Sequence, residues 1–126
     1  LSLMATVAVA QDTESTKPIQ SDYYRILKFT LPEKEVLEVG AAEPLPGGKV
    51  AFATRRGEVW IVDNAYAEDP KNAKITRFAH GLHEVLGLAY KDGWLYVTQR
   101  CELSRIKDSN GDGKADVFET RHTKAL

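Results

Sequence analysis

Short runs of alternating apolar and polar residues recur along the chain, and turn signals separate them. Alternation with a period of two is typical of β-strands with one buried face, and no segment of helix length shows a convincing helical period. Strands are predicted at residues 23–31, 36–39, 50–54, 58–62, 75–78, 86–90, 94–98 and 103–106. The turn signals are Pro46-Gly47-Gly48, Arg56-Gly57, Lys91-Asp92-Gly93 and Asn110-Gly111. The pattern therefore predicts an all-β fold.

An internal repeat organises these strands. Residues 50–64 (VAFATRRGEVWIVDN) align without gaps on residues 94–108 (WLYVTQRCELSRIKD), at an offset of 44 residues. A repeat of about 40–45 residues built from short strands is typical of β-propeller blades, each of which is a four-stranded sheet. Two similar hairpins in a β-sandwich are the alternative. Because a closed propeller takes about 4–8 blades, we expect residues 22–126 to be the N-terminal blades of an incomplete ring.

The start of the chain has the character of the end of a signal peptide. Residues 1–10 (LSLMATVAVA) are small and apolar and end in Ala8-Val9-Ala10, which fits an A-x-A cleavage site. Ten apolar residues are too few to span a bilayer, and a buried N-terminal strand is the alternative. Residues 11–21 are polar and are expected to form a flexible leader. We therefore expect an exported protein, periplasmic or extracellular, without a membrane span.

Composition narrows the choice of function. The 126 residues carry a formal net charge of −1 and scattered basic residues, which gives no electrostatic reason to expect nucleic acid as a partner. The single cysteine, Cys101, excludes an internal disulfide and a cysteine-based metal site, and we expect it to be a small buried strand residue. The sequence contains no Ser/His/Asp arrangement, phosphate-binding glycine loop or His-rich zinc motif that would support a hydrolase or a nucleotide enzyme.

Residues 108–119 (DSNGDGKADVFE) match the calcium-loop pattern D-x-[DN]-x-[DN]-G-x5-E at every constrained position. Calcium takes about 6–8 oxygen ligands, and a tight loop presents alternate side chains to its interior. The expected ligands are the side chains of Asp108, Asn110 and Asp112, the carbonyl of Lys114, Asp116 directly or through water, and Glu119 as a bidentate ligand. Gly113 permits the sharp turn.

The residues before this loop are expected to form a strand, so the motif predicts an EF-hand-like calcium loop between strands. In that setting Glu119 is the ligand that depends most on a missing exit helix. An acidic surface turn without a metal is the alternative.

Several short phrases follow one another in residues 81–116. They are Gly81-Leu82, Gly87-Leu88-Ala89, Asp92-Gly93, Leu95-Tyr96-Val97, Gln99-Arg100 and residues 108–116. In this order they resemble the glucose/sorbosone dehydrogenase-like β-propellers of exported bacterial proteins, over roughly residues 35–120. Val85 and Cys101 depart from the family pattern, which usually has Pro and Gly there.

The resemblance implies a six-bladed ring with quinoprotein activity. Relatives hold pyrroloquinoline quinone (PQQ) on one face of the ring and oxidise a sugar hydroxyl, and an electron-transfer partner is then expected. The resemblance places the catalytic histidine in a blade outside these residues. The second hypothesis is a non-catalytic propeller that binds glycan or protein ligands through its loops.

Two residues are candidates for a site within the chain. His83 is the catalytic candidate, since a histidine beside a carboxylate such as Glu84 can act as a tuned base. Neighbouring strand residues point to opposite faces, so loop packing or solvent exposure is the alternative. Arg100, which aligns with Arg56, is the candidate for binding an anionic cofactor. Each arginine is followed two residues later by a glutamate, and a repeated structural ion pair is the simpler interpretation.

Overall fold

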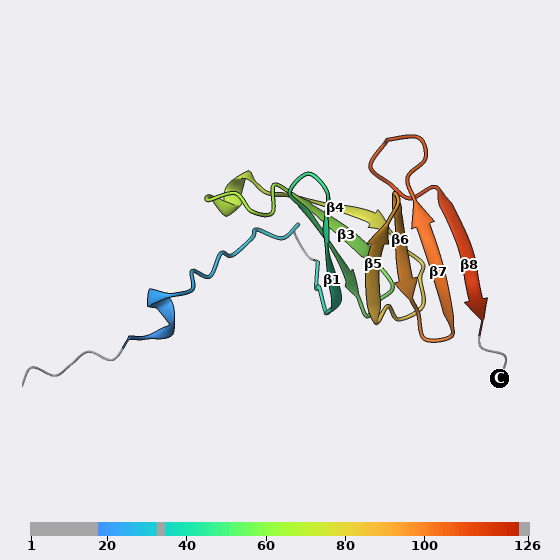
Figure 1. Cartoon of the computed structure of the whole chain (residues 1–126), viewed down its shortest axis with the longest axis horizontal. Helices are drawn as coiled ribbons and strands as arrows, with labels where there is room; N and C mark the ends of the chain where they lie inside the picture. The colour runs from blue at the N-terminus through green and yellow to red at the C-terminus, as the bar shows by residue number, and fades with distance from the viewer. Residues whose placement is uncertain (1–17, 33–34, 124–126) are drawn as a thin grey trace, which may run out of the picture.

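The computed structural model describes residues 18–32 and 35–123, and within them the fold is all-β, as predicted (Figure 1). Sheet A contains β1 (Val39–Leu45), β2 (Lys49–Thr54), β3 (Val59–Asp63) and β4 (Lys74–Ala79). Sheet B contains β5 (Gly87–Lys91), β6 (Trp94–Thr98), β7 (Glu102–Lys107) and β8 (Val117–Thr123). Each sheet is an antiparallel meander in chain order. The helical structure described is limited to two short 3-10 turns, η1 (Gln20–Asp22) and η2 (Pro70–Asn72).

The predicted strands are confirmed where alternation was strongest, from β2 to β7. The strand predicted at residues 23–31 is wrong: this segment follows η1 as irregular chain that pairs with no strand of the described residues, and Tyr23, Tyr24 and Ile26 are exposed. Residues 36–39 only lead into β1, whose glycine and proline obscured the strand in the sequence. The eighth strand, β8, was not predicted, because its first residues belong to the calcium-loop motif.

The proposed signal-peptide remnant at residues 1–10 lies outside the described residues, as does most of the leader. Among the residues that are described, no helix is long and apolar enough to cross a membrane.

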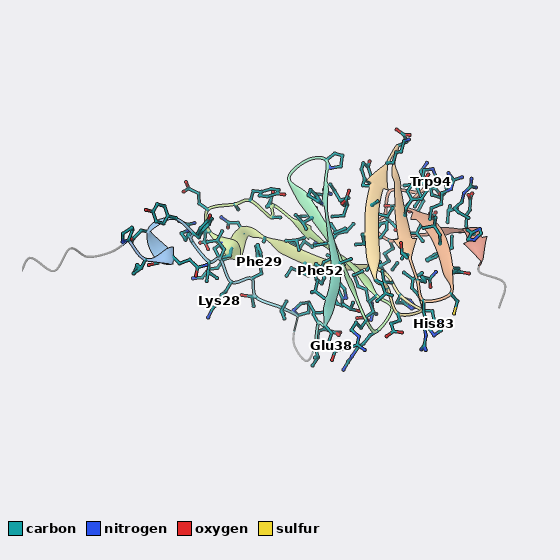
Figure 2. All side chains as sticks on the ribbon, turned by 60° about the horizontal axis from the view of Figure 1, so that its bottom comes forward. Lys28, Phe29, Glu38, Phe52, His83 and Trp94 are labelled. Atoms are coloured by element: carbon teal, nitrogen blue, oxygen red, sulfur yellow. The ribbon has the colours of Figure 1, made fainter. Side chains whose placement is uncertain are left out.

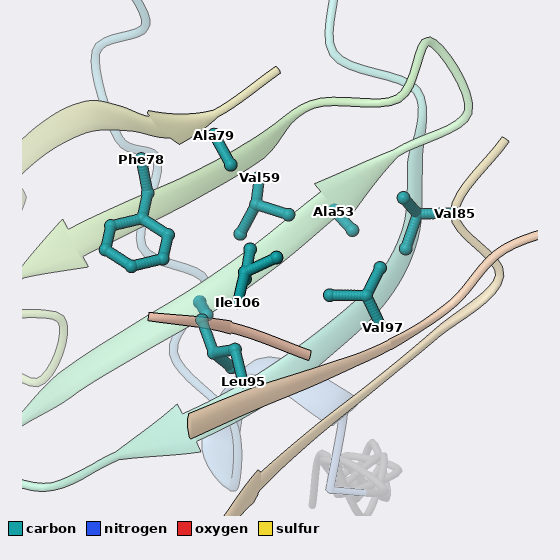
Figure 3. Close-up of a cluster of buried hydrophobic side chains, with 9 residues drawn as sticks. Ala53, Val59, Phe78, Ala79, Val85, Leu95, Val97 and Ile106 are labelled. Atoms are coloured by element: carbon teal, nitrogen blue, oxygen red, sulfur yellow. The ribbon is translucent and has the colours of Figure 1, made fainter. Parts of the chain in front are cut away.

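The main hydrophobic core lies between the two sheets (Figure 3). Strands β2 and β3 of sheet A contribute small residues, with Ala51, Ala53 and Val59 all at 0% exposure, and β4 adds Phe78. Sheet B places larger side chains opposite them: Leu95, Val97 and Ile106. Small side chains facing large ones allow the close packing typical of protein interiors. Burying each of the larger side chains stabilises the fold by about 1.5–3 kcal/mol.

The hydrogen-bond registers show that the two sheets are repeats of one another. A β-bulge interrupts the β3–β4 ladder between Val59 and Trp60, and a second interrupts the β7–β8 ladder between Leu103 and Ser104. Matching the bulges places β3 on β7 at an offset of 44 residues and β2 on β6 at an offset of 45. The gapless alignment is therefore correct for β3 but one residue out for β2. The cause is the intervening turn, which is one residue longer in sheet A than in sheet B.

This register determines which faces of the two sheets meet. The face of sheet A that is buried against sheet B carries Ala51 and Ala53, whose counterparts Tyr96 and Thr98 lie on the outer face of sheet B. The outer face of sheet A carries Phe52, whose counterpart Val97 is buried against sheet A. The sheets thus pack head to tail, with opposite faces in contact. A contact of this kind uses two different surfaces and is therefore heterologous.

Gly57, in the β2–β3 turn, connects sheet A to the segment between the sheets. It has φ +82°, its carbonyl accepts the Leu82 N–H at 3.0 Å, and a Cβ built on it would lie 1.8 Å from the Leu82 carbonyl oxygen. We expect Gly57→Ala to lower the free energy of unfolding by about 3 kcal/mol, since it combines left-handed backbone strain with a backbone clash. Urea unfolding monitored by circular dichroism measures this loss.

Gly47→Ala is the matched control. Gly47 also has a positive φ, +76°, but nothing lies within 4 Å of an added Cβ. Its expected cost is about 1 kcal/mol. Equal losses in the two variants would contradict a role for the close approach to Leu82.

Candidate metal centre

The predicted calcium loop connects β7 to β8 and projects from the upper end of sheet B in Figure 1. Two backbone hydrogen bonds fix its C-terminal part. The Asp116 N–H donates to the Lys107 carbonyl at 3.0 Å, which closes the base of the loop. The Ala115 N–H donates to the Phe78 carbonyl of sheet A at 2.8 Å. The loop is therefore anchored to both sheets.

Alternate side chains of the loop turn back onto its own backbone. The Asp108 carboxylate accepts the Gly111 N–H at 2.7 Å through one oxygen and the Gly113 N–H at 2.8 Å through the other. The Asn110 side-chain oxygen accepts the Asp112 N–H at 2.9 Å, and the Asp112 carboxylate accepts the Lys114 N–H at 2.8 Å. Gly113 has φ +85°, so it occupies the tight turn expected of it. These bonds hold the loop in a tight curl.

Asp116 closes the loop by a different contact. One of its carboxylate oxygens accepts the Ser109 N–H at 2.7 Å, and the other accepts the Ser109 hydroxyl at 2.6 Å. These two hydrogen bonds hold the pKa of the Asp116 carboxyl below its usual value. Asp116 is therefore ionised at neutral pH, as a metal ligand must be. The role of Ser109 was not predicted, although its place beside Asp108 in the motif was a usable signal.

Glu119 lies in β8 and faces away from the loop interior. In the β7–β8 ladder it is paired with Arg105, and its carboxylate contacts the Arg105 guanidinium at 2.7 and 2.8 Å. This hydrogen bond raises the pKa of Arg105. The guanidinium also lies 4.0 Å from the centre of the Trp94 ring, on the outer face of sheet B. The loop ends in a strand instead of a helix, so residue 119 is directed toward the sheet.

The donor set of residues 108–116 suits a hard cation. Asp108, Asn110, Asp112, Asp116 and the Lys114 carbonyl supply oxygen only, which is the chemistry that calcium prefers. Each ionised carboxylate oxygen keeps a lone pair beyond the N–H bond that it accepts. Within residues 18–32 and 35–123, no three His, Cys, Asp or Glu side chains gather closely enough to hold a metal ion by themselves. The amide and carbonyl oxygens are thus required members of any calcium shell here.

The other candidate residues lie at the opposite end of the sheets, on the β2–β3 and β6–β7 turns and the segment before β5. Figure 2 shows His83 and Glu38 along this edge. The backbone N–H of Arg100 donates to the His83 carbonyl at 3.0 Å, and that of Arg55 donates to the Glu38 carbonyl at 3.0 Å. Arg55, and not Arg56, is therefore the counterpart of Arg100. The His83 residue itself is exposed.

Glu84 connects these two arginines. Its carboxylate lies 3.5 Å from the Arg55 guanidinium and 3.7 Å from that of Arg100, with both arginine side chains more than half exposed. The prediction of repeated ion pairs between Arg56 and Glu58 and between Arg100 and Glu102 is wrong. The structure pairs Glu58 with Arg77 at 3.3 Å instead. The reason is that Arg56 and Arg100 lie in turns between strands, where residues two apart do not share a face as they do within a strand.

A buried polar network behind His83 was not predicted. Gln99, 8% exposed, accepts the His83 N–H through its side-chain oxygen and donates at 2.8 Å to both Glu102 and Ser104. Ser104 also donates to Glu102. Cys101, expected in a buried strand, is exposed in the turn between these residues, so that expectation is wrong. The only sequence signal was a polar residue ending an alternating strand.

Two groups of polar residues therefore occupy opposite ends of sheet B. One group has the oxygen donors of a calcium loop. The other has one glutamate that bridges two arginines beside an exposed histidine. No family model, no curated protein and no solved structure matches this chain.

Gln99→Leu is expected to lower the free energy of unfolding by about 2 kcal/mol. The leucine leaves the His83 N–H and the Ser104–Glu102 pair without their buried partner. Thr98→Val is the control at the adjacent exposed position and should change stability by less than about 0.5 kcal/mol. Urea unfolding of both variants tests the network. A Gln99→Leu protein as stable as the control would show that the network contributes nothing.

Proposed function

We propose that this chain is a calcium-binding part of an exported β-propeller, and that residues 108–116 hold the ion. The observation that carries the proposal is the conformation of the loop. Alternate Asp and Asn side chains accept hydrogen bonds from its backbone N–H groups, and an ionised Asp116 closes it. Extracellular calcium modules bind with dissociation constants of about 10⁻⁴–10⁻³ M, which suits a permanently filled structural site. Export is supported by the character of residues 1–10.

The propeller architecture is supported by how the two sheets meet. Both are four-stranded antiparallel meanders with bulges at corresponding positions. In a sandwich of two sheets related by a two-fold axis, equivalent faces would be in contact. Here the contact is head to tail, which is the relation between successive blades of a ring. The inner strands β1 and β5 are also neighbours, as in a propeller.

Calcium is expected to raise the melting temperature of the chain, because it binds the folded loop and not the unfolded chain. Asp112→Asn should weaken calcium binding by about tenfold or more, since it removes a ligand charge. The substitution keeps the oxygen that accepts the Lys114 N–H, so the metal-free loop is preserved. Isothermal titration calorimetry and thermal unfolding in EGTA and in millimolar calcium measure both effects.

Glu119→Gln determines whether the last residue of the motif is a ligand. Because Glu119 is paired with Arg105, the variant should bind calcium within about twofold of the wild-type protein. A large loss would restore Glu119 to the ligand set. Identical melting curves of the wild-type protein in EGTA and in calcium would contradict the proposal of a calcium site.

The activity that we propose for the whole ring is oxidation of a sugar-like alcohol by a quinone, and this rests on the resemblance to glucose/sorbosone dehydrogenase-like propellers. The residues described here do not form a quinone site by themselves. Arg100, the cofactor candidate, has Glu84 as its partner, and His83 is exposed. Fold alone does not determine function, so the activity requires its own test.

That test uses a longer protein that contains this chain, supplied with PQQ and calcium. Dye-linked oxidation of sugars that depends on both additions is the expected result. Binding of glycan or protein without quinone binding would instead support the non-catalytic propeller. The calcium site of residues 108–116 is independent of this outcome.

A further inference from the structure

One peptide group of the loop faces both the candidate metal site and the neighbouring sheet. The peptide between Lys114 and Ala115 contributes the Lys114 carbonyl, an expected calcium ligand, and the Ala115 N–H, which donates to the Phe78 carbonyl at 2.8 Å. The described chain contains no cis peptide bond, so the C=O and N–H of this group point in opposite directions. The peptide therefore lies between the metal site and sheet A.

The sheet A side of this contact is a strand edge. Phe78 lies at the bulge of β4, where the ladder with β3 shifts register, and β4 is the outer strand of sheet A. Phe78 is 8% exposed and belongs to the core between the sheets, and Ala115 packs against the same core. The hydrogen bond thus joins the loop of sheet B to an otherwise open edge of sheet A.

We propose that calcium binding in the loop stabilises the contact between the two sheets, through the Lys114–Ala115 peptide, as well as the loop itself. This inference rests on the proposed calcium site. A cation on the Lys114 carbonyl polarises the peptide and strengthens its N–H as a donor to Phe78. Binding of Lys114 and Asp116 to the ion also restricts Ala115, which lies between them. The loop then gains less conformational entropy when it undocks from sheet A, so the docked state is favoured.

Amide hydrogen exchange of the wild-type chain tests the inference without any substitution. At a calcium concentration about ten times the dissociation constant, protection of the Ala115 amide should rise about tenfold. The Tyr90 amide is the internal reference, since it joins the same two sheets at the inner strands by donating to the Glu43 carboxylate at 3.0 Å. Its protection should rise less than that of Ala115.

A matched pair of variants separates the sheet contact from general stability. Phe78→Ala loosens the core beside Ala115, whereas Phe52→Ala removes the same side chain, also 8% exposed, from the cluster on the outer face of sheet A. Both should lower the melting temperature in EGTA. The increase in melting temperature caused by calcium should shrink in Phe78→Ala and persist in Phe52→Ala, because linkage between docking and metal binding is reciprocal.

The outcomes distinguish the inference from the proposed function. If the wild-type chain binds no calcium, the proposed site fails and the inference fails with it. If it binds calcium but only Gly111, Gly113 and the other loop amides gain protection, the site stands and the inference is wrong. Equal calcium responses in Phe78→Ala and Phe52→Ala would likewise overturn the link to sheet A.

Discussion

The contact between sheet A, where β2 presents alanines, and the larger side chains of sheet B is the constraint on which the structure depends. A single four-stranded meander of this length cannot bury its own apolar face, so it needs a neighbour. Ala51 and Ala53 share one buried cluster with the larger Leu95 and Ile106. Because the two contacting faces differ, the contact sets a direction along the repeat. Both candidate sites are positioned by it, at opposite ends of the same pair of sheets.

The parts of the fold that sequence could predict are those determined by local alternation. Strands β2 to β7 follow it, since each has one face in a core and turn residues at both ends. Residues 23–31 alternate as well, yet without a neighbouring strand their backbone groups have no ladder to join. The register between repeats depends on a single residue in a turn, and a gapless alignment cannot detect that difference.

The candidate site shows the same division between local and long-range information. The motif specified the alternating oxygens and the place of Gly113, because these depend only on the chain within the loop. It did not specify the direction in which the chain leaves. Leaving as β8, the chain places Glu119 opposite Arg105 in a ladder. Contacts across the sheets, such as the glutamate shared by Arg55 and Arg100, were likewise out of reach of local pattern.

The loop lies at the edge of the two sheets where the hydrophobic packing between them is weakest. At the inner strands the sheets are held by a buried core and by the Glu43–Tyr90 hydrogen bond. At the outer edge, Phe118 of β8 is 51% exposed, so hydrophobic contact is weaker there. The corresponding connection of sheet A, residues 64–73, has no alternating acidic motif. The proposed calcium loop at the outer edge of sheet B would therefore reinforce the contact between the sheets at the place where side-chain burial contributes least.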